Sequence, residues 1–231
     1  MDIKSSAKSC RDALQRGIYL IINPFVRLLI RCGVTPNMVT TVGLLGQIAG
    51  AALMIRGGYV ASRGGNPYEA FMWAGIMIIL FSVFDMLDGQ VARLGNMQSA
   101  FGAMYDSVLD RYSEMFTLGG LAFYLIQRGD LWGAIITFIA LVGSLMVSYV
   151  RARAEGLDIE CKIGFMQRPE RVVVTTIGII ATGVYGLCQD PGESFNPDIF
   201  AIGAMTIVAI FANLTAFARI NHCRKALKAR K

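Results

Sequence analysis

The sequence predicts an all-α integral membrane protein with six transmembrane helices, preceded by an N-terminal amphipathic helix that lies on the membrane interface. Of its 231 residues, 55% are hydrophobic and only 16% are charged, and the mean hydropathy is +0.52. The charged residues gather between long apolar runs, which is typical of a chain that crosses a membrane several times. We expect a single membrane domain over residues 1–231, with an interfacial or cytosolic segment at 1–36, a six-helix core at 37–221 and a basic tail at 222–231.

Six apolar runs have about the 20 residues that a helix needs to cross a bilayer. Residues 18–30 are also apolar, but the run is too short to span and is interrupted by Asn23-Pro24, so we expect it to lie on the interface. Glycines in the first and third runs (Gly43, Gly46, Gly50, Gly119 and Gly120) predict close packing of helices. The six predicted spans are 38–55, 70–94, 98–127, 131–150, 172–188 and 199–219.

The distribution of Lys and Arg predicts the topology. Six lie in the N-terminal segment, five in the loop between the fourth and fifth spans, and six at the C-terminal tail. The opposite side of the membrane receives only Arg56, Arg63 and Arg128. By the positive-inside rule both termini are cytoplasmic. The net charge of +6 is thereby explained by topology, and no nucleic-acid partner is expected.

The cysteines and the single histidine predict neither a disulfide framework nor a zinc site. The five cysteines (Cys10, Cys32, Cys161, Cys188, Cys223) show no C-x-x-C spacing. Only Cys188 is expected to face away from the cytosol, so all five are predicted to be free thiols. His222 has no metal-binding neighbours in the sequence, and we interpret it as a surface residue.

One acidic motif organises the chemistry: Asp85-x2-Asp88-Gly89-x2-Ala92-Arg93-x8-Gly102-x3-Asp106-x3-Asp110. On a helix, Asp88 lies about 60° from Asp85, and Asp110 about 40° from Asp106. The predicted topology places all four acids at the cytosolic face. Solvated acids at a helix end would explain either pair alone, but four carboxylates beside residues with little side chain favour binding of divalent cations. Oxygen ligands favour Mg²⁺ or Mn²⁺, and one or two such ions would neutralise the cluster.

The complete motif resembles the signature of the CDP-alcohol phosphotransferase family. The segments Gly33-Val34-Thr35-Pro36-Asn37-x2-Thr40, Ser148–Glu155 and Gln167–Arg171 resemble stretches of its bacterial phosphatidylinositol-phosphate synthase branch. Two positions differ from that branch, since Arg151 replaces a lysine and Gln167 replaces a glutamate.

The resemblance implies transfer of a phosphatidyl group from CDP-diacylglycerol to a polyol acceptor, with release of CMP. Inositol phosphate is the first candidate, while glycerol phosphate, free inositol or another lipid, as in a cardiolipin-type synthesis, stay open. It also implies a homodimer in a bacterial-type inner membrane, with the active site at the cytosolic face.

The roles implied for individual residues fall into four groups. Asp85, Asp88 and Asp106 would hold two divalent ions, and Asp110 would be the general base and also a metal ligand. Nucleotide-binding candidates are Gly89, Ala92, Arg93, Gly102, Asn37 and Thr40. Candidates for binding the acceptor phosphate are Arg151, Arg168, Arg171 and Arg219.

Two further interpretations complete the predictions. Arg111 and Glu114 are spaced for an ordinary intrahelical ion pair with no catalytic role. From a different class of protein, an ion-coupled transporter would also carry intramembrane acids. Transporters tend to show repeated halves and acids near the membrane midplane, neither of which is found in this sequence.

Overall fold

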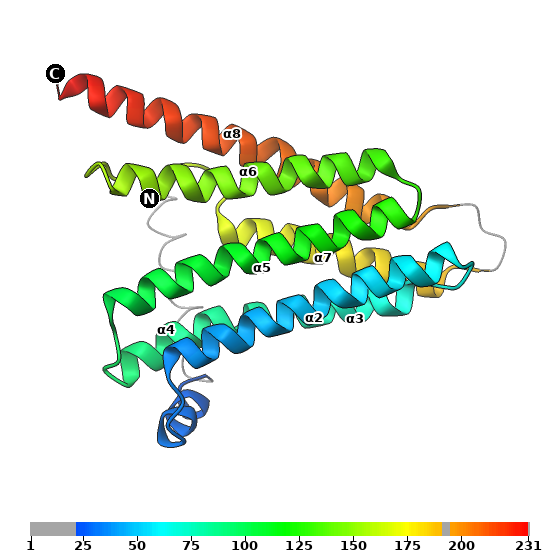
Figure 1. Cartoon of the computed structure of the whole chain (residues 1–231), viewed down its shortest axis with the longest axis horizontal. Coiled ribbons are helices and arrows are strands. Elements are labelled where there is room, and N and C mark those ends of the chain that lie inside the picture. The colour runs from blue at the N-terminus through cyan, green and yellow to red at the C-terminus, as the bar shows by residue number, and fades with distance from the viewer. Residues whose placement is uncertain (1–21, 191–194, 231) are drawn as a thin grey trace, which may run out of the picture. The chain divides into compact units, whose positions relative to one another are not determined.

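The computed structural model describes residues 22–190 and 195–230, and every regular element within these ranges is an α-helix. Residues 22–31 are helical, whereas residues 18–21 of the predicted interfacial helix lie outside the described residues. Figure 1 labels the other helices in chain order. They are α2 (Pro36–Ser62), α3 (Tyr68–Ser82), α4 (Phe84–Leu94), α5 (Ala100–Gln127), α6 (Leu131–Glu155), α7 (Arg168–Cys188) and α8 (Ile199–Ala229).

Five helical segments of the described chain are long and apolar enough to cross a membrane: α2, Tyr68–Leu94, α6, α7 and α8. They coincide with five of the six predicted spans. The helix α5 coincides with the predicted span 98–127 but falls outside this class, because its first half carries Asp106, Asp110, Arg111 and Glu114. The all-helical membrane fold is therefore confirmed, and the count of six spans stays a prediction.

The predicted span 70–94 consists of two helices, α3 and α4, separated at Val83. The backbone of Val83 stays in the α-helical region (φ −68°, ψ −26°), so the interruption is limited to one residue. A short connection then links α4 to α5. In this connection Asn96 adopts φ 51°, and the N–H of Met97 donates to the carbonyl of Ala92 at 2.9 Å. The chain can therefore turn within five residues between the two acidic helices.

The contacts divide the chain into two compact units, which we describe separately. Among the described residues, the first unit comprises 22–43 and 83–109, and the second comprises 44–82, 110–190 and 195–230. The helices α2 and α5 contribute their first turns to the first unit and their remaining turns to the second. A small apolar core, formed by Val26, Val39, Leu87 and Val91, lies in the first unit.

In the second unit α6 packs along α8, and α7 packs against both α3 and α8 (Figure 1). Small residues allow these helices to approach closely. A Cβ at Gly183 of α7 would lie 2.5 Å from the backbone nitrogen of Met72 in α3. Such a distance is too short for any side chain, so glycine is required where these two backbones meet.

The predicted packing role of the other glycines is confirmed at three positions. A Cβ at Gly46 would overlap the Phe81 ring, and one at Gly50 would lie 3.1 Å from Ile78. A Cβ at Gly120 would lie 3.0 Å from the Cα of Ala51. Gly119, in contrast, has nothing within 4 Å, so the prediction for that residue was wrong. For Gly43 it stays a prediction.

A buried carboxylate connects three helices of the second unit. Asp198, 1% exposed, accepts hydrogen bonds from the Tyr124 hydroxyl at 2.6 Å and from Arg128 Nε at 2.9 Å. Arg128 Nη2 also donates to the Tyr68 hydroxyl at 3.3 Å. A buried charge with these partners is satisfied, and the network fixes the starts of α3 and α8 to the end of α5.

Candidate active site

A cavity of about 370 Å³ lies within the first unit, and residues of the acidic motif line much of it. Its walls come from the start of α2, from α4, from the connection after α4 and from the first turns of α5. All six predicted nucleotide-binding residues line it, as do two of the four acids, Asp88 and Asp106. The full lining is Pro36, Asn37, Thr40, Asp88, Gly89, Ala92, Arg93, Met97, Gln98, Ser99, Gly102, Ala103 and Asp106.

Asp88 is the most enclosed acid of the motif. Its side chain is 5% exposed and accepts a hydrogen bond of 2.6 Å from the Thr40 hydroxyl. The carboxylates of Asp106 and Asp85 lie near enough to act on its charge. The hydroxyl of Thr40 therefore fixes the orientation of a carboxylate that also faces two like charges, and an added cation would relieve this repulsion.

The small residues of the motif leave room in the cavity. A Cβ at Gly89 would have one neighbour within 4 Å, Arg93 Nη2 at 3.5 Å. A Cβ at Gly102 would lie 3.0 Å from Ser99 Oγ and 3.5 Å from Asn37 Oδ1. The side chain of Arg93 folds back along α4, where its Nε donates to the Gly89 carbonyl at 3.0 Å. Gly89 is therefore not needed for packing of the protein itself, which favours a role in admitting a ligand, whereas Gly102 also lies close to Ser99.

The donor atoms around the cavity suit a hard divalent cation. Among the residues that the structure describes, no three His, Cys, Asp or Glu side chains are grouped closely enough to hold a metal ion by themselves. Asp88 and Asp106 nevertheless present carboxylates to one cavity. Magnesium is commonly held by one or two carboxylates together with waters and substrate phosphates. The residues present fit such an arrangement.

The fourth acid, Asp110, belongs to the second unit, although it follows Asp106 by one turn of the same helix. Its Oδ1 lies 2.7 Å from Arg168 Nη2, and its Oδ2 lies 3.6 Å from Arg111 Nη1. The Asp110 and Arg168 side chains are 12% and 25% exposed. A carboxylate held by a guanidinium in this way is both charged and fixed in orientation.

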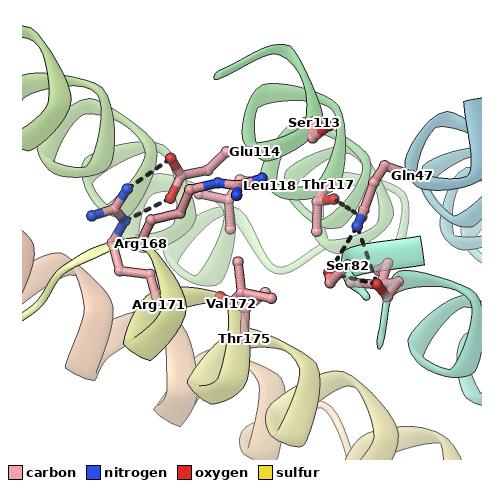
Figure 2. A pocket seen from close by; sticks show the side chains of 11 residues that line it. Gln47, Ser82, Ser113, Glu114, Thr117, Leu118, Arg168, Arg171, Val172 and Thr175 are labelled. Atoms are coloured by element: carbon pink, nitrogen blue, oxygen red, sulfur yellow. Dashed lines mark hydrogen bonds and ion pairs between the residues drawn. The ribbon is translucent and has the colours of Figure 1, made fainter. Parts of the chain in front are cut away.

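One turn further along α5, Glu114 forms a buried ion pair with Arg171 of α7. Arg171 Nε and Nη2 donate to the two carboxylate oxygens at 2.6 and 2.9 Å, and Figure 2 shows the two parallel bonds. Arg171 is 1% exposed, and its Nη1 donates to the Met166 carbonyl at 3.3 Å. The sequence predicted Arg111 as the partner of Glu114, whereas the residue that forms two hydrogen bonds with Glu114 is Arg171.

A small cavity of about 30 Å³ adjoins this ion pair (Figure 2). Besides Glu114, Arg168 and Arg171, it is lined by polar residues, including Gln47 and Thr117, and by the apolar Ile78, Leu118 and Val172. Gln47 Nε2 donates to Ser82 Oγ at 2.9 Å and to the Ile78 carbonyl at 3.1 Å, while Thr117 donates to its Oε1 at 3.1 Å. The volume is sufficient for about one or two water molecules.

The remaining two acceptor candidates differ in exposure. Arg151 is partly exposed and pairs with Glu155 one turn away, with 2.9 Å between Nε and Oε1. Arg219 is 2% exposed and donates to the carbonyls of Ile163 at 2.8 Å and Val147 at 2.6 Å. All four candidates lie in the second unit, and each contacts other residues of the protein. Of the four, only Arg151 and Arg168 have appreciable exposed surface.

Sequence reasoning missed two features of this region. It gave Glu114 no role beyond its predicted ion pair, although Glu114 lies one turn after Asp110 and so shares its helix face. It also passed over Gln98 and Ser99, which line the first cavity from the variable gap of the motif. The position of Glu114 one turn after Asp110 could have indicated that it lies near the site. Nothing in the sequence of the gap, in contrast, marks Gln98 or Ser99 as residues that line the cavity.

Comparisons with known proteins match most of the chain. A family model described as CDP-alcohol phosphatidyltransferase matches residues 33–216. The phosphatidylinositol phosphate synthase of Corynebacterium glutamicum is 33% identical over 167 residues, covering 71% of each chain. That of Streptomyces avermitilis is 35% identical over 210 residues, covering 89% of this chain and 78% of the relative.

Solved structures are similar over the same extent. The crystal structure of Mycobacterium tuberculosis phosphatidylinositol phosphate synthase with CDP-DAG bound matches with a TM-score of 0.73 and 30% identity, covering 88% of this chain and 93% of the other. The same enzyme in complex with manganese and citrate matches with a TM-score of 0.70 and 30% identity, covering 87% of each chain.

Proposed function

Because the chain belongs to the CDP-alcohol phosphatidyltransferase family, we propose that it transfers the phosphatidyl group of CDP-diacylglycerol to inositol phosphate and releases CMP. It is a membrane transferase of phospholipid biosynthesis. The observation that carries the proposal is the cavity in which Asp88 and Asp106 meet the six candidate nucleotide-binding residues. The names of the relatives support inositol phosphate as acceptor, ahead of glycerol phosphate or free inositol.

Asp85, Asp88 and Asp106, with Asp110, would hold two divalent ions, Mg²⁺ or Mn²⁺. The relative solved with manganese supports a divalent ion in this role. When bound, such ions would neutralise the pyrophosphate and the leaving CMP. The chain's own contribution is orientation, because Thr40 fixes Asp88 through its 2.6 Å hydrogen bond. Mutation of a residue that orients a metal ligand in this way typically lowers metal affinity by about 10–100-fold.

The small residues would admit the nucleotide. Gly89, Ala92 and Gly102 line the cavity and leave backbone accessible to a ligand. The guanidinium of Arg93 is exposed at the end of α4 and is suited to a phosphate. Asn37 and Thr40 line the opposite wall at the start of α2.

Asp110 would act as the general base. The acceptor hydroxyl would lose its proton to an Asp110 oxygen while its own oxygen forms a bond to the phosphorus of the phosphatidyl group. The bond from that phosphorus to CMP would break, and CMP would leave with the bonding electrons. Arg168, 2.7 Å from Oδ1, would keep the carboxylate oriented toward the hydroxyl.

The four arginines would divide into two roles. Arg151 and Arg168 have exposed surface and would contact the acceptor phosphate while keeping their ion pairs with Glu155 and Asp110. Arg171 and Arg219 are enclosed. They would shape the pocket by fixing α7 against α5, and α8 against α6 and the loop between α6 and α7. The protein would lie in the inner membrane with both termini and the active site on the cytosolic side. The homodimer implied by the resemblance stays a prediction.

The decisive experiment supplies purified protein with CDP-diacylglycerol, Mg²⁺ and a panel of acceptors, and identifies the lipid product by mass spectrometry. We expect phosphatidylinositol phosphate and one CMP for each lipid formed. Asp110→Asn is expected to abolish CMP release in a folded protein, whereas Glu160→Gln, an exposed residue paired with Lys162, serves as the control and keeps activity. Chelation of divalent ions should stop the wild-type reaction.

Comparable CMP release by Asp110→Asn would remove Asp110 from the base role. If a lipid product formed only with another acceptor, that acceptor would replace inositol phosphate in the proposal. The proposed transfer of the phosphatidyl group would stand. Ion flux in proteoliposomes without CMP formation would instead favour the transporter.

A further inference from the structure

A separate groove of about 780 Å³ lies between the C-terminal halves of α6 and α8, within the second unit. None of the residues assigned to the reaction above lines it. The wall from α6 and the residues after it comprises Met146, Tyr149, Val150, Arg153, Ala154 and Leu157. The wall from α8 comprises Ile220, Cys223, Arg224, Leu227 and Lys228.

The surface of the groove is apolar and accessible. Five of its large apolar side chains are 36–61% exposed: Met146, Tyr149, Leu157, Ile220 and Leu227. Together they form a hollow rather than a flat face. A hollow between two long helices can hold a chain of methylene groups more tightly than the flat lipid-facing side of one helix.

Three cations border this apolar surface: Arg153, Arg224 and Lys228. The lining contains no acidic residue. Within residues 22–190 and 195–230 none of the three forms an ion pair, whereas their neighbours Arg151 and Lys162 pair with Glu155 and Glu160. The groove therefore combines an apolar wall with positive charge that the described protein does not neutralise.

We propose that this groove binds one anionic membrane phospholipid, with acyl chains on the apolar wall and the phosphodiester among Arg153, Arg224 and Lys228. Basic pockets between transmembrane helices are suited to such headgroups. A zwitterionic lipid would leave the excess positive charge uncompensated.

The test measures lipid selectivity with phosphatidylglycerol and phosphatidylcholine as probes. The purified full-length protein is mixed with equal amounts of the two lipids, and bound lipid is counted by native mass spectrometry. The test variant is Arg224→Gln/Lys228→Gln. The control, Lys162→Gln/Lys225→Gln, removes the same charge from exposed residues nearby that do not line the groove.

We expect the wild type and the control to retain one phosphatidylglycerol in preference to phosphatidylcholine. In the test variant this preference should fall by about fivefold for each cation removed. Size-exclusion chromatography and circular dichroism establish that both variants are folded. Leu227→Glu, which places a negative charge in the groove, should also abolish the preference.

Three results would overturn the proposal. One is equal loss of preference in the test and control variants, which would indicate a general effect of surface charge. Another is a lower oligomeric state in the test variant, which would assign the groove to a second copy of the chain. The last is displacement of the bound lipid by CDP-diacylglycerol, together with a KM for CDP-diacylglycerol that rises in the test variant by the same factor as the lipid preference falls. That result would assign the groove to the substrate. Failure of the catalytic test above would leave the lipid-selectivity and oligomeric-state readouts unaffected.

Discussion

Asp88 and Asp110 lie on successive helices of one motif but are held by different chemistry. Asp88 accepts from a neutral hydroxyl, Thr40, and keeps its negative charge uncompensated. Asp110 faces the guanidinium of Arg168. The first arrangement suits a metal ligand, since the charge is left for the ion, and the second suits a base whose orientation must be fixed.

At the same scale, Arg171 is expected to stabilise the protein rather than contact the acceptor. Arg171→Ala would leave Glu114 buried without a partner, so the free energy of unfolding should fall by about 3–5 kcal/mol. The exposed pair of Arg151 and Glu155 provides the control, because Arg151→Ala should lower the free energy of unfolding by at most about 1 kcal/mol. Thermal unfolding in detergent measures both.

A double variant separates loss of the pair from loss of a phosphate contact. Glu114→Met/Arg171→Met replaces both charges with apolar side chains, and much of the stability should return. If Arg171→Ala were as stable as the wild type and raised only the KM for the phosphorylated acceptor, Arg171 would be a direct ligand of the phosphate.

At the scale of helices, packing in the second unit depends on which glycine faces a neighbouring backbone. The adjacent residues Gly119 and Gly120 provide a matched comparison. Gly120 faces the backbone of Ala51 in α2, whereas Gly119 faces open space. The difference arises because successive residues of a helix point about 100° apart.

We expect Gly120→Ala to lower the melting temperature and Gly119→Ala to leave it unchanged or raise it. The added methyl at Gly120 would force α2 and α5 apart, at a cost of about 1–3 kcal/mol. At Gly119 the methyl meets nothing, and alanine is the better helix former by up to about 1 kcal/mol. Equal melting temperatures for the two variants would contradict the close approach of α2 and α5.

For the whole molecule, the orientation in the membrane follows from the distribution of basic residues and can be measured by thiol labelling. Cys32 and Cys188 are both exposed, and the predicted topology places them on opposite sides of the membrane. In intact cells a membrane-impermeant maleimide should label a variant that retains only Cys188 and spare one that retains only Cys32. Labelling of Cys32 from outside would reverse the topology.

The buried Cys161 is an internal control for this labelling experiment. Burial raises the pKa of its thiol above the ordinary value, so less of the reactive thiolate is present at neutral pH. Cys161 should therefore label slowly even after the membrane is permeabilised, whereas Cys32 should then react.

The sequence predicted the helices well because their signals are local. Apolar runs, helical spacing and basic flanks each depend on residues close together in the chain, so five predicted spans match helices long enough to cross a membrane. The pairing of Glu114 was mistaken for a local one. Its bidentate partner, Arg171, lies 57 residues away, and spacing along one helix carries no information about a second helix.

The sequence by itself determined the family, through the resemblance of its acidic motif, and the all-helical membrane architecture, through composition and helical periodicity. It also supplied the small and acidic residues that line the cavity of the first unit. None of these signals depends on how helices meet. The tertiary structure alone decided that Thr40 orients Asp88, and that Arg171 and Arg219 are enclosed while Arg151 and Arg168 keep exposed surface. It also decided that three cations without an ion-pair partner among the described residues border the groove between α6 and α8. Burial and pairing are properties of the space between helices, and that space exists only once the chain has packed.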